Sequence, residues 1–168
     1  QEMFEGLEIS KNTALCSKWM NQWPVLFLSF KDVDGNCFEN AYEMLKFSLS
    51  QACITHTYLQ QDPKIDDTFQ KKFSALKDQT ASLQEVTSIL ILMQMMRDHY
   101  GKPVILLIDE YDVPIAKASA KGYYPEMLEV IKGLMSTALK DNDALRFAVI
   151  TGCLRIAKES IFTGTNNF

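Results

Sequence analysis

Three short, continuously apolar runs along the chain predict buried β-strands. They are Pro24–Phe30, Pro103–Ile108 and Leu145–Thr151. Apolar runs without polar alternation are typical of strands that are covered on both faces, as in the parallel sheets of α/β proteins. We therefore expect three adjacent parallel strands, with the central apolar run in the middle of the sheet.

Apolar residues at helical spacing fill the segments between these strands. Ser82 and Glu85 form a capping-box pattern at the start of one such segment, and Gly101 provides a stop at its end. Because strands and helices alternate, the order is βαβαβ, which predicts right-handed crossovers and a three-layer α/β sandwich. The expected helices are Phe38 to about Leu59, a short helix around Phe69–Leu76, Leu83–Tyr100, and Pro125 to about Lys140.

Composition narrows the functional classes. The length of 168 residues suits one compact domain. The formal net charge of −4 argues against non-specific binding of nucleic acid. No apolar run reaches the roughly 18 residues that a membrane span needs. The four cysteines contain no C-x-x-C pair, so we expect neither a zinc site nor a disulfide framework, but reduced thiols in a cytoplasmic protein.

Two acidic residues follow the central apolar run directly. Asp109 and Glu110 stand where ligands bind in open α/β sheets, at the carboxyl end of a strand. In P-loop NTPases the first such acid steadies Mg²⁺ at the nucleotide phosphates, and a following Glu can act as general base towards water. The alternative is that both acids simply end a strand at the solvent surface.

Polar residues also follow the third strand. Thr151 would lie beside Asp109 if the two strands are neighbours, where it could orient water or sense a terminal phosphate. Arg155 and Lys158 could reach an anionic ligand, and an Arg would bind phosphate oxygens in bidentate fashion. The alternatives are a tight turn at Gly152 and a solvated helix face.

Together these segments resemble a known family. The run from Leu107 to Ile115 is similar to the "LIDEYDxPI" signature of the bacterial and archaeal AAA-ATPase-like family, and Thr151–Phe162 with Asn166-Asn167 is similar to its "TGxxRxxKxSIFxxxNN" segment. Phe4–Ile9 and Trp23–Val25 resemble two further stretches of the family. The resemblance spans nearly the whole chain in order.

The resemblance implies a P-loop ATPase core that binds ATP with Mg²⁺, often fused to a domain similar to PD-(D/E)XK nucleases. It implies that Asp109 is the Walker B magnesium ligand, Glu110 the catalytic base and Thr151 a sensor-like catalytic residue. The other matching positions, taken as cofactor-binding, are Asp112, Arg155 and Asn166.

One part of the family pattern does not occur in the sequence. Residues 1–168 contain no G-x-x-x-x-G-K-[ST] motif, and only three residues precede Phe4, where the family has its phosphate loop. We therefore expect a partial domain, from Walker B to the sensor region, without its first strand and without a second domain. The missing strand would leave Leu145–Thr151 as an exposed edge that could self-associate. We also expect this chain alone to bind Mg-ATP weakly and to be inactive.

Two other functions stay open. One is a non-catalytic interaction module that keeps the fold without nucleotide. The other is a metal-dependent nuclease that uses Asp109, Glu110 and Asp112, although the D-x-K sequence at Asp62–Lys64 is far from these acids along the chain.

Overall fold

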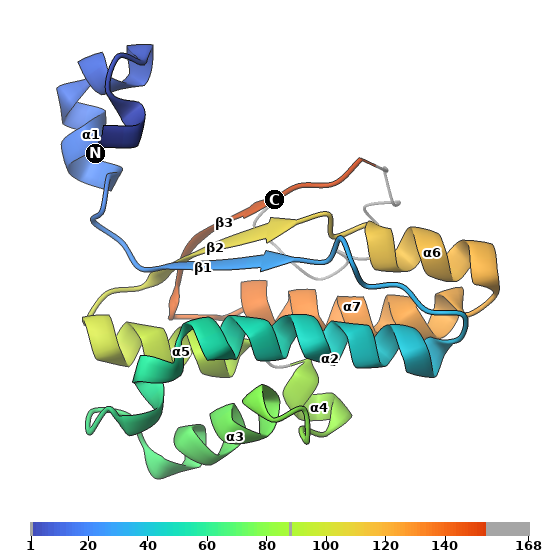
Figure 1. The fold of residues 1–168 in the computed structure, drawn as a ribbon. Coiled ribbons are helices and arrows are strands. Elements are labelled where there is room, and N and C mark those ends of the chain that lie inside the picture. The colour runs from blue at the N-terminus through green and yellow to red at the C-terminus, as the bar shows by residue number, and fades with distance from the viewer. Residues whose placement is uncertain (1, 88, 154–168) are drawn as a thin grey trace.

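A three-stranded parallel sheet forms the centre of the computed structural model, which describes residues 2–87 and 89–153 (Figure 1). The strands are β1 (Val25–Ser29), β2 (Val104–Asp109) and β3 (Leu145–Ile150), in the spatial order β1-β2-β3. Both pairings are parallel. The predicted strands and the central position of β2 are thus confirmed, and β3 forms one edge of the described sheet.

The helices largely follow the predicted periodicity. Tyr124 begins the last helix with Pro125 in its first turn, and Gly101 ends the helix before β2 in the left-handed conformation at φ 64°. A helix after β2, which begins near Pro114, was not predicted. The α-helices are α1 (Thr13–Trp19), α2 (Phe38–Thr55), α3 (Asp67–Lys77), α4 (Leu83–Val86), α5 (Leu90–Tyr100), α6 (Val113–Lys121) and α7 (Tyr124–Leu139), with 3-10 turns at Glu2–Phe4, Glu8–Lys11 and Thr57–Gln61.

The helix expected over residues 83–100 is in fact two helices, α4 and α5. The capping box at Ser82 and Glu85 is present, but α4 ends after Val86. The Thr137 hydroxyl of α7 donates to the carbonyl of Thr87, and the Thr87 hydroxyl itself bonds back to the carbonyl of Leu83 at 3.2 Å. Since a long-range donor takes the Thr87 carbonyl, a tertiary contact marks the point where the helix breaks.

Helices cover one face of the sheet. Figure 1 shows α2, α5 and α7 in a layer beneath the strands, with α3 and α4 outside that layer. The buried sheet residues on this side are Leu26, Leu28, Val104, Leu106 and Ile108. The expected three-layer sandwich is therefore incomplete in the described residues, because no layer of helices there covers the opposite face.

The opposite face of the sheet is apolar and open. Its exposed side chains are Val25, Phe27, Phe147 and Val149, with exposures between 38% and 56%. Side chains in a strand alternate between faces, so this surface is the reverse side of the core. We refer to these four residues as the open face.

The two 3-10 turns at Glu2–Phe4 and Glu8–Lys11, together with α1, form an N-terminal arm that projects away from the sheet (Figure 1). The arm meets the sheet near the start of β3, where the Trp19 ring packs edge-on against Phe147 at 5.4 Å between centroids. The guanidinium of Arg146 lies 5.2 Å from the Trp23 ring, a cation–π distance. Within the described residues, no helix has both the length and the apolar character of a membrane span.

The carboxyl end of α6 is tied to the loop after β1. Lys121 Nζ donates to Asp34 Oδ1 at 2.6 Å, and this bond holds the pKa of Asp34 below its ordinary value. Tyr123 donates its hydroxyl to the carbonyl of Gly35 at 2.9 Å. A side chain at Gly35 would meet the Ala41 nitrogen at 2.3 Å, so this loop lies directly against the start of α2.

The four cysteines should differ sharply in reactivity. Cys53 is 1% exposed inside α2, and burial raises the pKa of its thiol to about 12, whereas Cys37 and Cys153 are exposed. Because the thiolate is the reactive form, iodoacetamide at pH 8 should alkylate Cys37 and Cys153 in the native chain and leave Cys53 unmodified. Peptide mass spectrometry measures this, with the urea-unfolded chain as control. Rapid native labelling of Cys53 would contradict the described packing of α2.

Candidate functional site

Three polar side chains form a row across the sheet at the carboxyl ends of its strands. Ser29 of β1 pairs in register with Asp109 of β2. Ile108 pairs with Ile150, so Thr151, the residue after β3, lies level with Asp109. All three continue the alternation of the open face, and the row is therefore accessible from the uncovered side of the sheet.

A side-chain hydrogen bond joins the last two members of this row. Thr151 donates its hydroxyl to Asp109 Oδ1. Main-chain bonds fix the same geometry, because Thr151 N–H donates to the Ile108 carbonyl at 2.8 Å and Tyr111 N–H donates to the Thr151 carbonyl at 3.2 Å. The predicted convergence of Asp109 and Thr151 at one sheet edge is confirmed.

Glu110 occupies a strained turn directly after β2. Its φ of 54° lies in the left-handed region, which costs a residue with a side chain about 1–2 kcal/mol. The carbonyl of Glu110 accepts from Val113 N–H at 3.2 Å, so the turn leads into α6. Strain held by surrounding structure is common at functional sites, and here it fixes an acidic residue beside Asp109.

Asp112 is buried next to the segment that follows β3. It is 3% exposed, and its Oδ2 accepts from the main-chain N–H of Cys153 at 3.1 Å. Burial, together with the neighbouring Asp112 carboxylate, raises the pKa of Tyr111, which therefore stays a neutral phenol at physiological pH. The remaining sequence candidates, Arg155, Lys158 and Asn166, lie outside the described residues.

The row offers oxygen ligands of the kind that Mg²⁺ prefers. One carboxylate, from Asp109, and two hydroxyls, from Ser29 and Thr151, lie together. Mg²⁺ usually keeps several waters and takes one or two carboxylates beside substrate phosphates, so this donor set fits it. No group of three or more His, Cys, Asp or Glu that could hold a metal by itself occurs in the described part of the chain.

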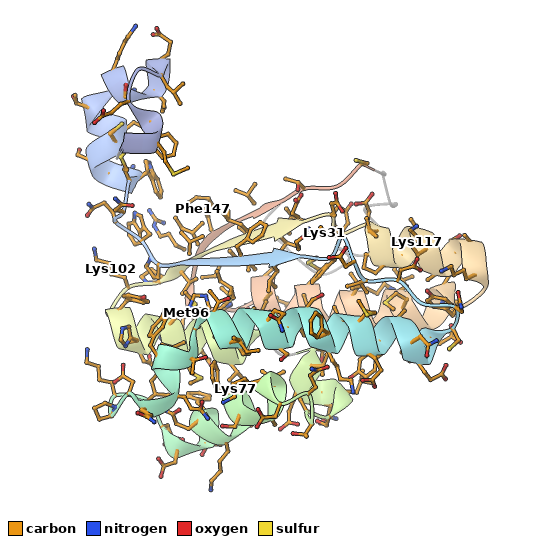
Figure 2. All side chains as sticks on the ribbon, in the orientation of Figure 1. Lys31, Lys77, Met96, Lys102, Lys117 and Phe147 are labelled. Atoms are coloured by element: carbon orange, nitrogen blue, oxygen red, sulfur yellow. The ribbon has the colours of Figure 1, made fainter. Side chains whose placement is uncertain are left out.

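Sequence reasoning missed two residues at this edge. Ser29 is the last residue of β1, and Lys31 follows just beyond it at the same end of the sheet (Figure 2). A cavity of about 400 Å³ extends from Ser29 and Asp32 along α2. In the sequence, Ser29 is a hydroxyl near the end of an apolar run. It indicates a site only once β1 is known to pair with β2.

The D-x-K sequence lies at the other end of the sheet. Asp62 Oδ2 contacts His99 Nδ1, and Lys64 Nζ donates to the His99 carbonyl at 3.2 Å. His99 belongs to the last turn of α5, which leads into the amino end of β2. Asp62 and Lys64 therefore do not join Asp109 in one site.

Replacing Glu110 with Gly should not destabilise the chain. Gly adopts positive φ without a steric penalty, and this gain outweighs its extra unfolded-state entropy, so Glu110→Gly should stabilise folding by about 0.5 kcal/mol. The matched control is Glu129→Gly, an exposed Glu inside α7, which should lose about 1 kcal/mol. Urea unfolding measures both, and an equal loss in the two variants would show that the turn is unstrained.

Comparisons with known proteins identify the family of the chain. Residues 1–162 match the AAA-ATPase-like family, described as a predicted AAA-ATPase. An uncharacterised protein encoded in the vnfD 5′ region of Azotobacter chroococcum mcd 1 is 39% identical over 71 residues, which are 40% of this chain. The match spans 13% of that relative's length. No solved structure matches the chain.

The family match covers all three strands that carry the row, β1, β2 and β3, together with the N-terminal arm. It extends over far more than half of the sequence. The chain therefore belongs to the AAA-ATPase-like family.

Proposed function

We propose that the chain is the Walker B and sensor part of an ATP-binding, ATP-hydrolysing domain with a P-loop fold. The observation that carries this proposal is the hydrogen bond from Thr151 to Asp109 across adjacent parallel strands. It brings a carboxylate and a hydroxyl together at the sheet edge where α/β proteins bind nucleotides. The family match supports the same function.

Each residue of the edge has a distinct proposed role. Asp109 supplies the carboxylate on the metal side, and Thr151 keeps that carboxylate oriented. Glu110 accepts a proton from the attacking water, a task that suits a carboxylate fixed by a strained turn. When bound, Mg²⁺ would neutralise charge on the phosphates. Asp112, Arg155 and Asn166 are proposed to belong to the cofactor-binding region, with Arg155 binding phosphate oxygens.

Lys31 adds a positive charge to an otherwise acidic edge. Asp109 and Glu110 alone would repel a polyanion, whereas Lys31 lies just past the carboxyl end of β1 (Figure 2). Ser29 lies two residues before Lys31 in the chain, and it pairs in register with Asp109 of β2. We infer that phosphate groups approach the row from this side.

In the whole protein, hydrolysis is proposed to drive or gate an attached activity, such as a nuclease-like domain. This part rests on the family resemblance. The curated relative is much longer than the matched segment, which leaves room for further domains in that protein.

A second candidate is a non-catalytic interaction module. The open face favours it, because Val25, Phe27, Phe147 and Val149 present exposed apolar side chains on one face of the sheet. The edge strand β3 adds a further route to association, since it pairs only with β2 in the described sheet. We therefore propose a second copy of the chain, bound through this edge, as the partner of such a module.

Titration with millimolar Mg-ATP tests the first candidate. No glycine-rich phosphate loop occurs in the 168 residues, so binding should be weak and turnover no faster than background. Amide shifts in NMR spectra should nevertheless cluster at Ser29, Asp109 and Thr151. Asp109→Asn should weaken the Mg²⁺-dependent part of the ATP affinity about tenfold, since contacts to a charged ligand contribute on the order of 1.5–3 kcal/mol. Glu110→Gln should leave binding unchanged.

The matched control is Asp141→Asn. Asp141 is an exposed acid just before β3, at the opposite end of the sheet. Its replacement should leave the titration unchanged. If a longer product of the same reading frame carries a phosphate loop, Glu110→Gln in that product should keep nucleotide bound and slow phosphate release. Shifts that cluster on the open face, or robust turnover by the 168-residue chain, would contradict the proposal.

A further inference from the structure

Asp112 stands at the start of α6 without capping that helix. It is the N-cap residue, a position where Asp is strongly preferred because its carboxylate accepts from the first free N–H groups of the helix. Within the described residues, however, its side chain makes no capping hydrogen bond to α6. The carboxylate is 3% exposed, so something other than capping offsets the cost of burying it.

The carboxylate instead reaches the segment that leaves β3. Asp112 Oδ2 accepts from the main-chain N–H of Cys153 at 3.1 Å, a contact between residues 41 positions apart. Hydrogen bonds to a charged acceptor are stronger than neutral ones. The contact therefore joins the beginning of α6 to the third strand's exit.

Gly152 lets the two segments approach this closely. A Cβ at Gly152 would lie 2.4 Å from Asp112 Oδ1 and 2.8 Å from the Tyr111 ring. Cβ atoms in proteins essentially never come so near to another heavy atom, so any larger residue would push the segment away from Asp112. The glycine is needed for contact with this particular carboxylate, since its φ is not in the left-handed region.

We propose that Asp112 is a positioning residue that holds the 151–153 segment so that Thr151 stays hydrogen-bonded to Asp109. Thr151 has two main-chain bonds to the β2 side, to Ile108 and from Tyr111. Asp112 anchors the chain two residues further on, which prevents Thr151 from rotating away with the exit segment. The functional meaning of this arrangement rests on the proposed role of Asp109 and Thr151. The contact of Asp112 with the 151–153 segment, which we call the clamp, does not depend on that role.

The arrangement also links the site to α6. Asp112 is the residue from which α6 starts, and Lys121 at its far end is bound to Asp34 of the loop after β1. A displacement of Thr151 would therefore be transmitted through Asp112 to the start of α6.

The test uses the 168-residue chain and no nucleotide. Asp112→Ala should lower the hydrogen-exchange protection of the Cys153 amide about tenfold, because its acceptor is gone. It should also move the ¹³C carboxyl signal of Asp109 in the same direction as Thr151→Val does, although Asp112 lies two residues beyond the Glu110 turn. The double variant Asp112→Ala/Thr151→Val should move that signal no further than Thr151→Val alone.

Two further variants separate positioning from general stability. Asp112→Asn keeps an acceptor oxygen on a side chain of the same shape. Unlike Asp112→Ala, it should therefore retain most of the exchange protection of the Cys153 amide and leave the Asp109 carboxyl signal close to its original position. Gly152→Ala should displace the segment and shift the Asp109 signal, and its effect should be smaller when Asp112 is already Ala, since the Oδ1 contact is then removed. Asp141→Asn is the control and should change neither readout.

A folded Asp112→Ala chain with unchanged Cys153 and Asp109 signals would overturn the inference. If Asp112→Ala does not fold, Gly152→Ala decides, and an unshifted Asp109 signal in that variant would overturn it equally. Because no readout involves Mg-ATP, the clamp can hold while nucleotide binding fails. The reverse outcome, binding at the row without coupling to Asp112, is equally recognisable.

Discussion

The parallel pairing of β2 with a strand on each side is the constraint on which the other features depend. It buries alternate residues of β2 on the helices and brings Ser29, Asp109 and Thr151 level with one another. The β2–β3 register shifts between Val104 and Ile105, before the strands reach their carboxyl ends. A slip of β2 by one residue against its neighbours would move Asp109 to the helix-covered face, where an isolated carboxylate is costly.

The strands and most helices could be predicted because their signals are local. Continuous apolar runs identified β1, β2 and β3, and Pro125 and Gly101 marked helix ends. The break between α4 and α5 could not be predicted, since it coincides with a bond from Thr137, 50 residues away. The helix α6 was missed because its short segment follows the acidic motif directly. The one-sided helical cover depends on how elements assemble in space, which periodicity does not report.

The candidate site also has features that could be predicted from the sequence and features that could not. Acidic residues at the end of a buried strand and a Thr at the end of the next one are readable in sequence, given the rule that ligands bind at the carboxyl ends of parallel strands. The burial of Asp112 and the positive φ of Glu110 are not, because each arises from contacts between β2, β3 and the α6 start. Ser29 was passed over since a single hydroxyl in an apolar run has no pattern of its own.

The open face has a thermodynamic consequence for the isolated chain. Unfolding normally exposes apolar surface to water, and this exposure sets both the heat-capacity increment and the steepness of denaturant unfolding. Val25, Phe27, Phe147 and Val149 are already partly hydrated in the folded state, with exposures between 38% and 56%. The chain should therefore unfold with a smaller heat-capacity change and a shallower urea transition than other domains of 168 residues, and any partner that covers this face should raise both quantities together.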